Sequence, residues 1–271
     1  MLDKKVGFIG CGNMAKAIIN GMIASQIISP ENIWVFDRKA ETNHSMAHQY
    51  GLNAADSLES MAKEVDILVS AVKPKVTTKI LGSIAGNLNK DSLVVSVAAG
   101  VTLDALATVL GHDRKIIRVM PNTPALVGVG MTSVTPNVMV TEEETQSIID
   151  IFKSFGKAEQ VDESLIHSVV GVSGSAPAYV FVMIEAMADA AVLGGMPRKQ
   201  AYEFAAQAVK GAAQMVLETG THPGELKDAV CSPGGTTIAA VQTLESKGFR
   251  SAIIEAMQHC MQKSEELSSK S

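Results

Sequence analysis

The sequence predicts an α/β protein with a doubly wound parallel sheet in its N-terminal part and an all-helical C-terminal part. Up to about residue 160, short β-rich runs alternate with helical patterns. This order is expected of a parallel sheet with helices on both faces. From residue 163 onward the chain is rich in Ala and Met, and Gly or Pro residues separate segments of strong helix propensity. We therefore expect two domains, residues 1–162 and 163–271.

Local signals in the sequence locate the individual elements of the N-terminal part. A "TEEE" sequence at 141–144 matches a capping box that opens a helix running to about Ser154. The run "AEQVDE" at 158–163 is the last expected strand. Apolar residues after the first strand recur at helical spacing, which predicts an early amphipathic helix. The five earlier strands are expected at residues 5–10, 33–37, 66–72, 92–98 and 115–120.

Composition favours a compact soluble protein that acts on a small molecule. Of the 271 residues, 46% are hydrophobic and 19% charged, and the net charge is −5 without any long Lys or Arg run. These values argue against disorder, nucleic-acid binding and a polybasic membrane patch. Three scattered cysteines and an N-terminus without a signal-peptide pattern favour the cytoplasm.

One segment, 176–195, is nearly apolar enough to resemble a membrane span. It contains Pro177, Glu185 and Asp189. Two carboxylates within an apolar helix favour burial in protein, so we expect this helix to lie at a subunit interface.

The stretch "GFIGCGNMA" matches the dinucleotide-binding pattern G-x-G-x-x-A. Gly10 permits the tight strand-to-helix turn, Gly12 lets a pyrophosphate approach the backbone, and Ala15 allows close packing of the helix on the strand. The motif lies between an expected strand and an amphipathic helix. This context predicts a Rossmann-type dinucleotide-binding domain.

The end of the second expected strand bears on the choice of cofactor. Asp37 lies 22 residues after Ala15, and a carboxylate there accepts hydrogen bonds from the ribose of NAD but repels the 2′-phosphate of NADP. Arg38 and Lys39 follow directly and would pair with that phosphate. The residues leave the choice between NAD and NADP open, and a solvated turn without any ligand is a further alternative.

Three more turns follow later strands. Ligands of open α/β sheets bind beyond the carboxyl ends of the strands, so these turns are placed to contact one elongated cofactor. The residues concerned are Ala71, Val72, Lys73 and Pro74, then Ala98, Ala99 and Gly100, and finally Met120, Pro121 and Asn122.

Other kinds of catalytic chemistry find little support. The six histidines form no metal-binding pattern, so no metal site is expected, and the pair His44 and His48 is interpreted as a solvated helix face. Ser173 and Ser175 are interpreted as helix-start or pocket-lining hydroxyls.

A second glycine-rich stretch, "CSPGGTT" at 231–237, precedes a helix in the C-terminal part. Gly-Gly at a helix start exposes backbone N–H groups, which together with the helix dipole favour an anion. Because this stretch is outside the dinucleotide-binding domain, we interpret it as a cradle for a substrate carboxylate. A dinucleotide site and a carboxylate cradle in one chain indicate a redox enzyme.

These motifs together resemble those of the pyrroline-5-carboxylate reductase family from end to end. The stretches "VGFIGCGNMA", "AVKP", "VSVAAGVTL", "VMPNTPA" and "GVSGSAPAYVF" carry the resemblance in order and spacing. The most specific stretch is "HPGELKDAVCSPGGTTIAAVQTLE" at 222–245. The resemblance implies reduction of 1-pyrroline-5-carboxylate to L-proline, with NADPH preferred and NADH possible. It also implies that the cofactor pyrophosphate is held by Gly10, Cys11, Gly12, Asn13, Met14 and Ala15.

The resemblance also implies the assembly and the substrate site. The helical part would be a dimerisation domain, and dimers would be the building block of a larger homo-oligomer such as a decamer. Thr237 would face the imine nitrogen as the catalytic residue. The other substrate contacts would come from Ser175, Ser232, Gly234, Gly235 and Thr236. Asp37 departs from the small or polar residue of many members, which leaves the NADPH preference open.

Two other functions are weighed against this one. A β-hydroxyacid dehydrogenase, or a related imine reductase, shares the layout, but the dehydrogenase would need a lysine early in the helical domain, and "GVSGSAPAYVFVMIEAM" has none. A non-catalytic NAD(P) sensor would keep the dinucleotide-binding half without needing the second cradle.

Overall fold

The computed structural model describes residues 2–269, so Met1 and the last two residues of the predicted helical domain lie outside it. The described chain forms two compact units. The first comprises the residues up to Gly174 and those from Cys260 onward, and the second is Ser175–His259. A domain boundary between residues 162 and 163 stays a prediction.

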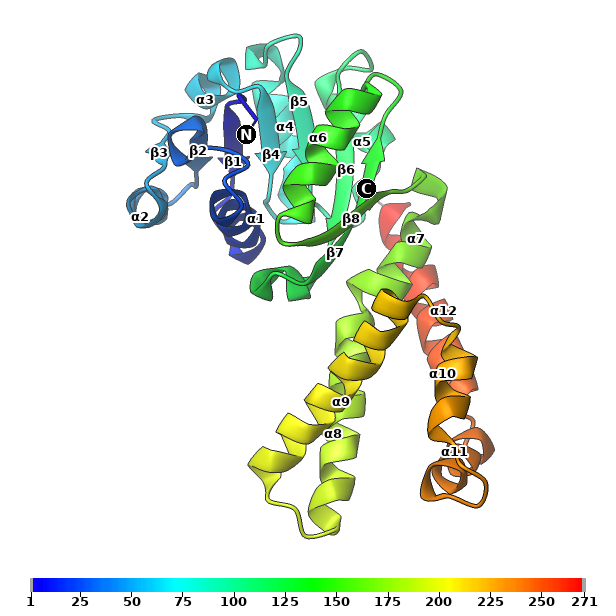
Figure 1. Cartoon of the computed structure of the whole chain (residues 1–271). Coiled ribbons are helices and arrows are strands. Elements are labelled where there is room, and N and C mark those ends of the chain that lie inside the picture. Colours follow the sequence, from blue (N-terminus) through cyan, green and yellow to red (C-terminus); the bar gives the residue numbers. More distant parts are fainter. Residues whose placement is uncertain (1, 270–271) are drawn as a thin grey trace. The chain divides into compact units, whose positions relative to one another are not determined.

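The first unit is built on one sheet with the strand order β3-β2-β1-β4-β5-β6-β7-β8 (Figure 1). All neighbouring strands run parallel except β6 and β7, which are antiparallel. The strand order reverses between β1 and β4, and Ile9 of β1 is paired with Phe36 on one side and Ser70 on the other. This arrangement confirms the Rossmann-type α/β fold. The strands are β1 (Val6–Ile9), β2 (Ile33–Phe36), β3 (Asn53–Ala54), β4 (Ile67–Ser70), β5 (Leu93–Ser96), β6 (Ile116–Pro121), β7 (Gly130–Pro136) and β8 (Gly156–Gln160).

Two of these strands were not expected from the sequence. β3 has two residues, too few to show a periodic pattern, and the Asn53 side chain anchors it by donating to the Glu31 carbonyl at 2.6 Å. β7 reads "GMTSVTP" and buries Thr132, Ser133 and Thr135, so it lacks the apolar run that marks the other central strands. Its pairing with β6 supplies the one antiparallel step in the sheet.

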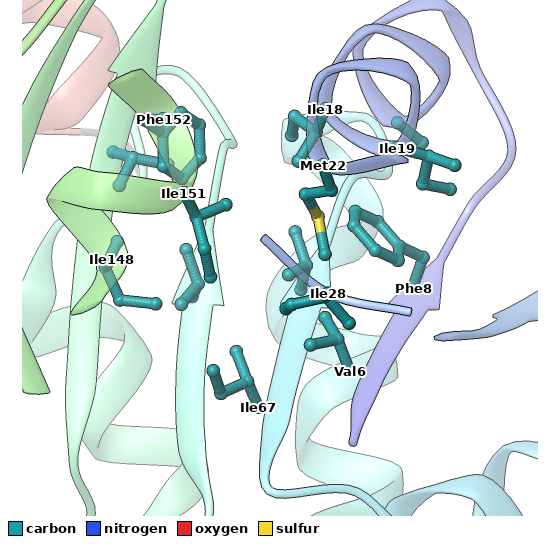
Figure 2. Close-up of a cluster of buried hydrophobic side chains, with 14 of the residues drawn as sticks. Val6, Phe8, Ile18, Ile19, Met22, Ile28, Ile67, Ile148, Ile151 and Phe152 are labelled. Carbon is teal, nitrogen blue, oxygen red and sulfur yellow. The ribbon is translucent and has the colours of Figure 1, made fainter. Parts of the chain in front are cut away.

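Helices cover both faces of the sheet, as expected. Side chains of α1 (Asn13–Ala24), α2 (Ala40–Tyr50) and α6 (Glu142–Lys153) enter one hydrophobic cluster. Side chains of α3 (Leu58–Glu64), α4 (Pro74–Ile84) and α5 (Leu103–Leu110) enter the other. In the first cluster Phe8 of β1 lies beside Met22 of α1, and Ile18 of α1 and Phe152 of α6 belong to the same cluster (Figure 2). This packing fixes the start of α1 relative to β1.

The predicted capping box of α6 is confirmed. The Glu144 N–H donates to Thr141 Oγ1 at 3.2 Å, and the Thr141 N–H donates to Glu144 Oε2 at 3.0 Å. Each side chain thus satisfies a backbone donor at the helix start.

A partly buried ion pair fixes the segment that follows the sheet. Arg118 of β6 is 2% exposed and donates to Glu163 Oε1 at 3.0 Å, and the same oxygen accepts the Leu103 N–H at 2.8 Å. The carboxylate therefore joins β6 to the start of α5. The remaining short elements of this unit are η1 (Pro30–Asn32), η2 (Ala85–Asn87), η3 (Thr123–Val127), η4 (Glu163–Leu165), α7 (Ile166–Val169) and the π-helix η5 (Val170–Gly174).

The second unit is all helical. It contains α8 (Ala176–Leu193), α9 (Arg198–Thr219), α10 (Pro223–Val230), α11 (Thr236–Ser246) and the first half of α12 (Phe249–Ser268). α8 and α9 lie side by side, and their buried positions are alanines, whose small side chains let two helices approach closely (Figure 1).

The α8 region is apolar yet exposed in the single chain. Ala188 is the one residue of α8 that is buried, and Phe181 and Val182 are 60% and 64% exposed. Within the described residues, the helical stretch Glu163–Leu193 is long and apolar enough, by length and composition, to cross a membrane. Helices of soluble proteins that are covered by protein can be equally long and apolar. Length and composition alone therefore do not distinguish a membrane span from such a helix.

Candidate active site

The turn between β1 and α1 needs glycine at its first position. Gly10 has a φ of +93°, and a Cβ there would lie 2.9 Å from the Ala71 carbonyl oxygen. The Gly10 N–H donates to Phe36 O at 2.8 Å, and the Ala71 N–H donates to Ile9 O at 2.9 Å. The turn thereby holds the ends of three neighbouring strands, β2, β1 and β4, at one edge of the sheet.

Gly12 leaves the start of α1 open to a ligand. It is the N-cap residue, it is exposed, and no side chain caps the helix. A Cβ at Gly12 would meet nothing within 4 Å, so the space beside this residue at the helix start is open. Ala15 is fully buried against the sheet. The residues present therefore fit the pyrophosphate of a dinucleotide, which such a helix start binds through N–H groups and the helix dipole.

Asp37 is partly buried and connects β2 to the glycine-rich turn. Its Oδ2 accepts the Cys11 N–H at 3.1 Å, and its Oδ1 accepts the Lys39 N–H at 3.1 Å. Burial, and next the nearby Asp37 charge, raise the pKa of the Cys11 thiol to about 11, so this thiol is protonated at neutral pH. Arg38 is exposed beside this carboxylate. Asp37 thus supports the loop as well as placing a negative charge at its edge.

The other predicted cofactor residues lie at the same edge of the sheet. Residues 71–73 connect β4 to α4, which begins at Pro74. Residues 98–100 follow β5, and residues 120–122 include the end of β6 and the residue after it. Because these strands are parallel neighbours, the structure brings the three turns together beside residues 10–15. Ser70, which was not among the predicted site residues, lies at the same edge: its hydroxyl is buried at the end of β4 and has no hydrogen-bond partner among residues 2–269. The signal was a serine closing the otherwise apolar run "ILVS".

Asn122 differs from its neighbours because its side chain bonds within the protein. Its Oδ1 accepts the Met131 N–H at 2.9 Å, and its Nδ2 donates to the carbonyl and the hydroxyl of Ser173 at 3.3 and 3.2 Å. No local sequence pattern marks the contact with Ser173, which is 51 residues away in the chain.

In the second unit, the turn between α10 and α11 forms the expected open helix start. Gly234 has a φ of +69°, and the Gly235 N–H donates to Ser232 O at 3.0 Å. Gly235 is the N-cap of α11, and no side chain caps this helix. Thr236 is exposed and Thr237 partly buried in the first turn. The backbone N–H groups here are available to an anion.

Ser175 stands apart from that turn in the chain. It is the N-cap residue of α8 and the first residue of the second unit, and its carbonyl accepts the Ala178 N–H at 3.0 Å. Among residues 2–269, no group of three or more His, Cys, Asp or Glu side chains is gathered as metal ligands would be.

The sheet topology and the open glycine turn define the class: a nicotinamide-dinucleotide-dependent oxidoreductase. Residues 5–100 match the family model described as NADP oxidoreductase, coenzyme F420-dependent. Residues 163–267 match the model described as pyrroline-5-carboxylate reductase dimerisation. The chain is 64% identical to the pyrroline-5-carboxylate reductase of Escherichia coli, over 98% of this chain and 99% of the relative. The chain belongs to the pyrroline-5-carboxylate reductase family.

Solved structures agree with this assignment. The pyrroline-5-carboxylate reductase of Coxiella burnetii is 34% identical, superposes with a TM-score of 0.94, and the match covers 98% of this chain and 99% of that one. The pyrroline carboxylate reductase of Plasmodium falciparum, solved with NADP bound, is 32% identical with a TM-score of 0.86 over 99% of both chains. The cofactor is thus NAD(P)H, and the dimerisation domain makes the protein a homo-oligomer.

Removing the charge of Asp37 is expected to shift cofactor choice toward NADPH. In Asp37→Asn and Asp37→Ser, the ratio of kcat/KM for NADPH over NADH should rise about tenfold, because a like charge near a surface costs on the order of 1 kcal/mol. Asn retains an acceptor for the loop N–H groups, so it separates the effect of charge from that of loop support. Steady-state kinetics with both cofactors measures the ratio.

The control for this change is Asp91→Asn, which removes an exposed carboxylate between η2 and β5. It should leave the ratio unchanged. An unaltered ratio in both Asp37 variants would show that this carboxylate does not face the cofactor ribose.

Proposed function

We propose that this protein reduces 1-pyrroline-5-carboxylate to L-proline with NAD(P)H, the last step of proline biosynthesis. One observation carries the proposal: a chain 64% identical to a pyrroline-5-carboxylate reductase retains both an open dinucleotide turn at α1 and a second uncapped helix start at α11. The first suits a pyrophosphate and the second a small carboxylate.

The cofactor is held by the carboxyl edge of the sheet. The N–H groups of residues 12–15 bind the pyrophosphate, and the turns after β4, β5 and β6 line the nicotinamide half. NADPH is preferred, because Arg38 and Lys39 are exposed next to the site of the 2′-phosphate, while Asp37 retains appreciable use of NADH. When bound, the reduced nicotinamide supplies a hydride.

The substrate is held by the α10–α11 turn. Backbone N–H groups between Ser232 and Thr236 bind its carboxylate, and the Thr237 hydroxyl faces the ring nitrogen. Ser175 adds a polar contact from the start of α8. The supporting features are the missing side-chain cap on α11 and the left-handed Gly234, which expose these N–H groups.

The reaction depends more on how the imine is positioned against the cofactor than on acid–base groups of the protein. With the ring nitrogen protonated, the imine carbon accepts the hydride, the π pair of the C=N bond moves to nitrogen, and a C–H bond forms. Thr237 orients the nitrogen or relays a proton to it from water, because an unassisted threonine hydroxyl is too weak an acid to donate its own proton. Holding the imine carbon in line with the hydride donor supplies most of the rate enhancement.

Assembly accounts for the exposed apolar helices. Phe181 and Val182 of α8 and Phe204 of α9 are mostly exposed in the single chain, so a second copy covers them in the dimer. Five dimers would complete a decamer, which light scattering tests.

We assign the enzyme to the cytoplasm, where its soluble cofactor is found, and cell fractionation tests this assignment.

The activity is tested with purified protein and a panel of substrates. Consumption of NADPH and NADH is followed with pyrroline-5-carboxylate, with a β-hydroxyacid in the oxidative direction, and with acyclic imines. We expect consumption with pyrroline-5-carboxylate and formation of proline. If a folded, dimeric sample consumes neither cofactor, the proposal is wrong, and cofactor binding without turnover would favour a sensor.

A further inference from the structure

We infer that Asn122 is a positioning residue that holds the π-helix η5 against the end of β6, rather than a residue that contacts the cofactor. The inference rests on the proposed function for its kinetic consequences and on the observed hydrogen bonds for its structural ones. It concerns the first unit alone, in which both partners lie.

Both polar atoms of the Asn122 side-chain amide form hydrogen bonds within the protein. Its oxygen accepts the Met131 N–H from β7, and its nitrogen donates to both acceptor atoms of Ser173 in η5. The distances, 2.9, 3.3 and 3.2 Å, are those of hydrogen bonds. A side chain with both ends engaged in this way orients its partners and has little capacity left for a ligand.

The element that Asn122 holds is unusual and closely packed. η5 is a π-helix, a form that occurs mostly as short insertions and often at functional sites. A Cβ at Gly174 would lie 3.1 Å from Met120 Cε, so glycine lets η5 approach the end of β6. Asn122 and Met120 therefore lie against two neighbouring residues of η5: Asn122 bonds to Ser173, and Met120 lies next to Gly174.

The position of this contact suggests its effect. Met120 to Asn122 end the strand whose turn lines the nicotinamide half of the proposed cofactor site, and Ser173 lies two residues before Ser175 along the chain. Loosening η5 would let the residues around the reacting groups move without disturbing the pyrophosphate turn at Gly12. Small misplacements at a reacting centre cost rate more than binding.

The test uses three variants and one control, all in the full-length chain. Asn122→Asp keeps an oxygen for the Met131 N–H but loses the donor to Ser173. Ser173→Ala loses one of the two acceptors. The third variant combines both changes. Asn137→Asp is the matched control, because Asn137 bridges the other end of the β6–β7 pair in the same manner: its Oδ1 accepts the Ile116 N–H and its Nδ2 donates to Arg114 O.

We expect Asn122→Asp to lower kcat about tenfold and to change the Kd for NADPH less than threefold. Ser173→Ala should have a smaller effect, and the double variant should match Asn122→Asp, because both changes break one contact. In the cofactor-free protein, hydrogen exchange of residues 170–174 should accelerate in Asn122→Asp and remain unchanged in Asn137→Asp. This readout does not depend on the activity, so it tests the inference even if the proposed reaction fails.

Three results would overturn the inference. Weaker NADPH binding with unchanged exchange at 170–174 would show that Asn122 contacts the cofactor. Multiplicative losses in the double variant would show that Asn122 and Ser173 act independently. Equal losses of kcat in Asn122→Asp and Asn137→Asp would show that Asn122 acts only through the overall stability of the fold.

Discussion

Gly12→Val is expected to lower the affinity for NADPH by about 100-fold or more while the protein stays folded. The new side chain would occupy the open space in front of the first N–H groups of α1, where the pyrophosphate binds. Losing two charge-assisted hydrogen bonds costs about 3–6 kcal/mol, and about 1.4 kcal/mol corresponds to tenfold in Kd. Titration of the protein with NADPH, followed by cofactor fluorescence, measures the loss.

The reason the protein should stay folded is local. Gly12 has an ordinary φ of −77°, so a valine there introduces no backbone strain. Gly86→Val is the matched control, because Gly86 is also exposed with no neighbour within 4 Å, but lies in η2 after the end of α4. Equal NADPH affinity in the Gly12 variant and the wild type would rule out this turn as the pyrophosphate site.

The contrast with Gly10 shows why two glycines of one motif differ. At Gly10 a side chain would meet the Ala71 backbone and the φ of +93° is strained for other residues, so Gly10→Ala should lower the stability of the fold itself. Melting temperatures of the two variants would therefore differ even though both lose cofactor binding.

Thr237→Ala is expected to lower kcat/KM for pyrroline-5-carboxylate about 100-fold and to leave NADPH affinity unchanged. A positioned group that assists proton transfer contributes about 10²- to 10⁴-fold, and the low end applies because water can still protonate the nitrogen. Thr237→Ser should recover much of the activity, since it restores the hydroxyl without the methyl group. Steady-state kinetics over a range of pH measures both.

A control on the same helix is Thr243→Ala. The Thr243 hydroxyl is exposed and donates to the Ala239 carbonyl of its own helix at 3.1 Å, so its loss should leave kcat/KM unchanged. If Thr237→Ala turns over at the wild-type rate across the pH range, Thr237 is merely a helix-start residue.

Local sequence signals predicted the parts of the structure that depend on local physics. Gly10 and Gly12 fall at the strand-to-helix turn because only residues without Cβ suit a left-handed φ or an approach by a ligand. Thr141 and Glu144 predicted the start of α6 because a capping box requires those side chains at that spacing. The strands β1, β4 and β5 are buried on both faces and appear as short apolar runs, which end in a serine in β4 and β5.

The remaining features depend on contacts between distant residues. β7 has the composition of a loop and becomes a strand only because β6 and β8 pair with both of its edges. The bond from Asn122 to Ser173 joins residues 51 positions apart in the chain, so no local pattern marks it. Asp37 was expected at the ribose from its place at the end of the second strand. Its bond to the Cys11 N–H, through which it also supports the loop, is visible only in the folded structure.

The most direct test of the proposed reaction follows the hydride itself. The protein is mixed with pyrroline-5-carboxylate and NADPH carrying deuterium at the transferable position of the nicotinamide, and the proline formed is examined by mass spectrometry and NMR. Hydride transfer predicts proline with one deuterium on the ring carbon that belonged to the C=N bond. Proline without deuterium from fully labelled cofactor, or consumption of cofactor without proline, would contradict the account.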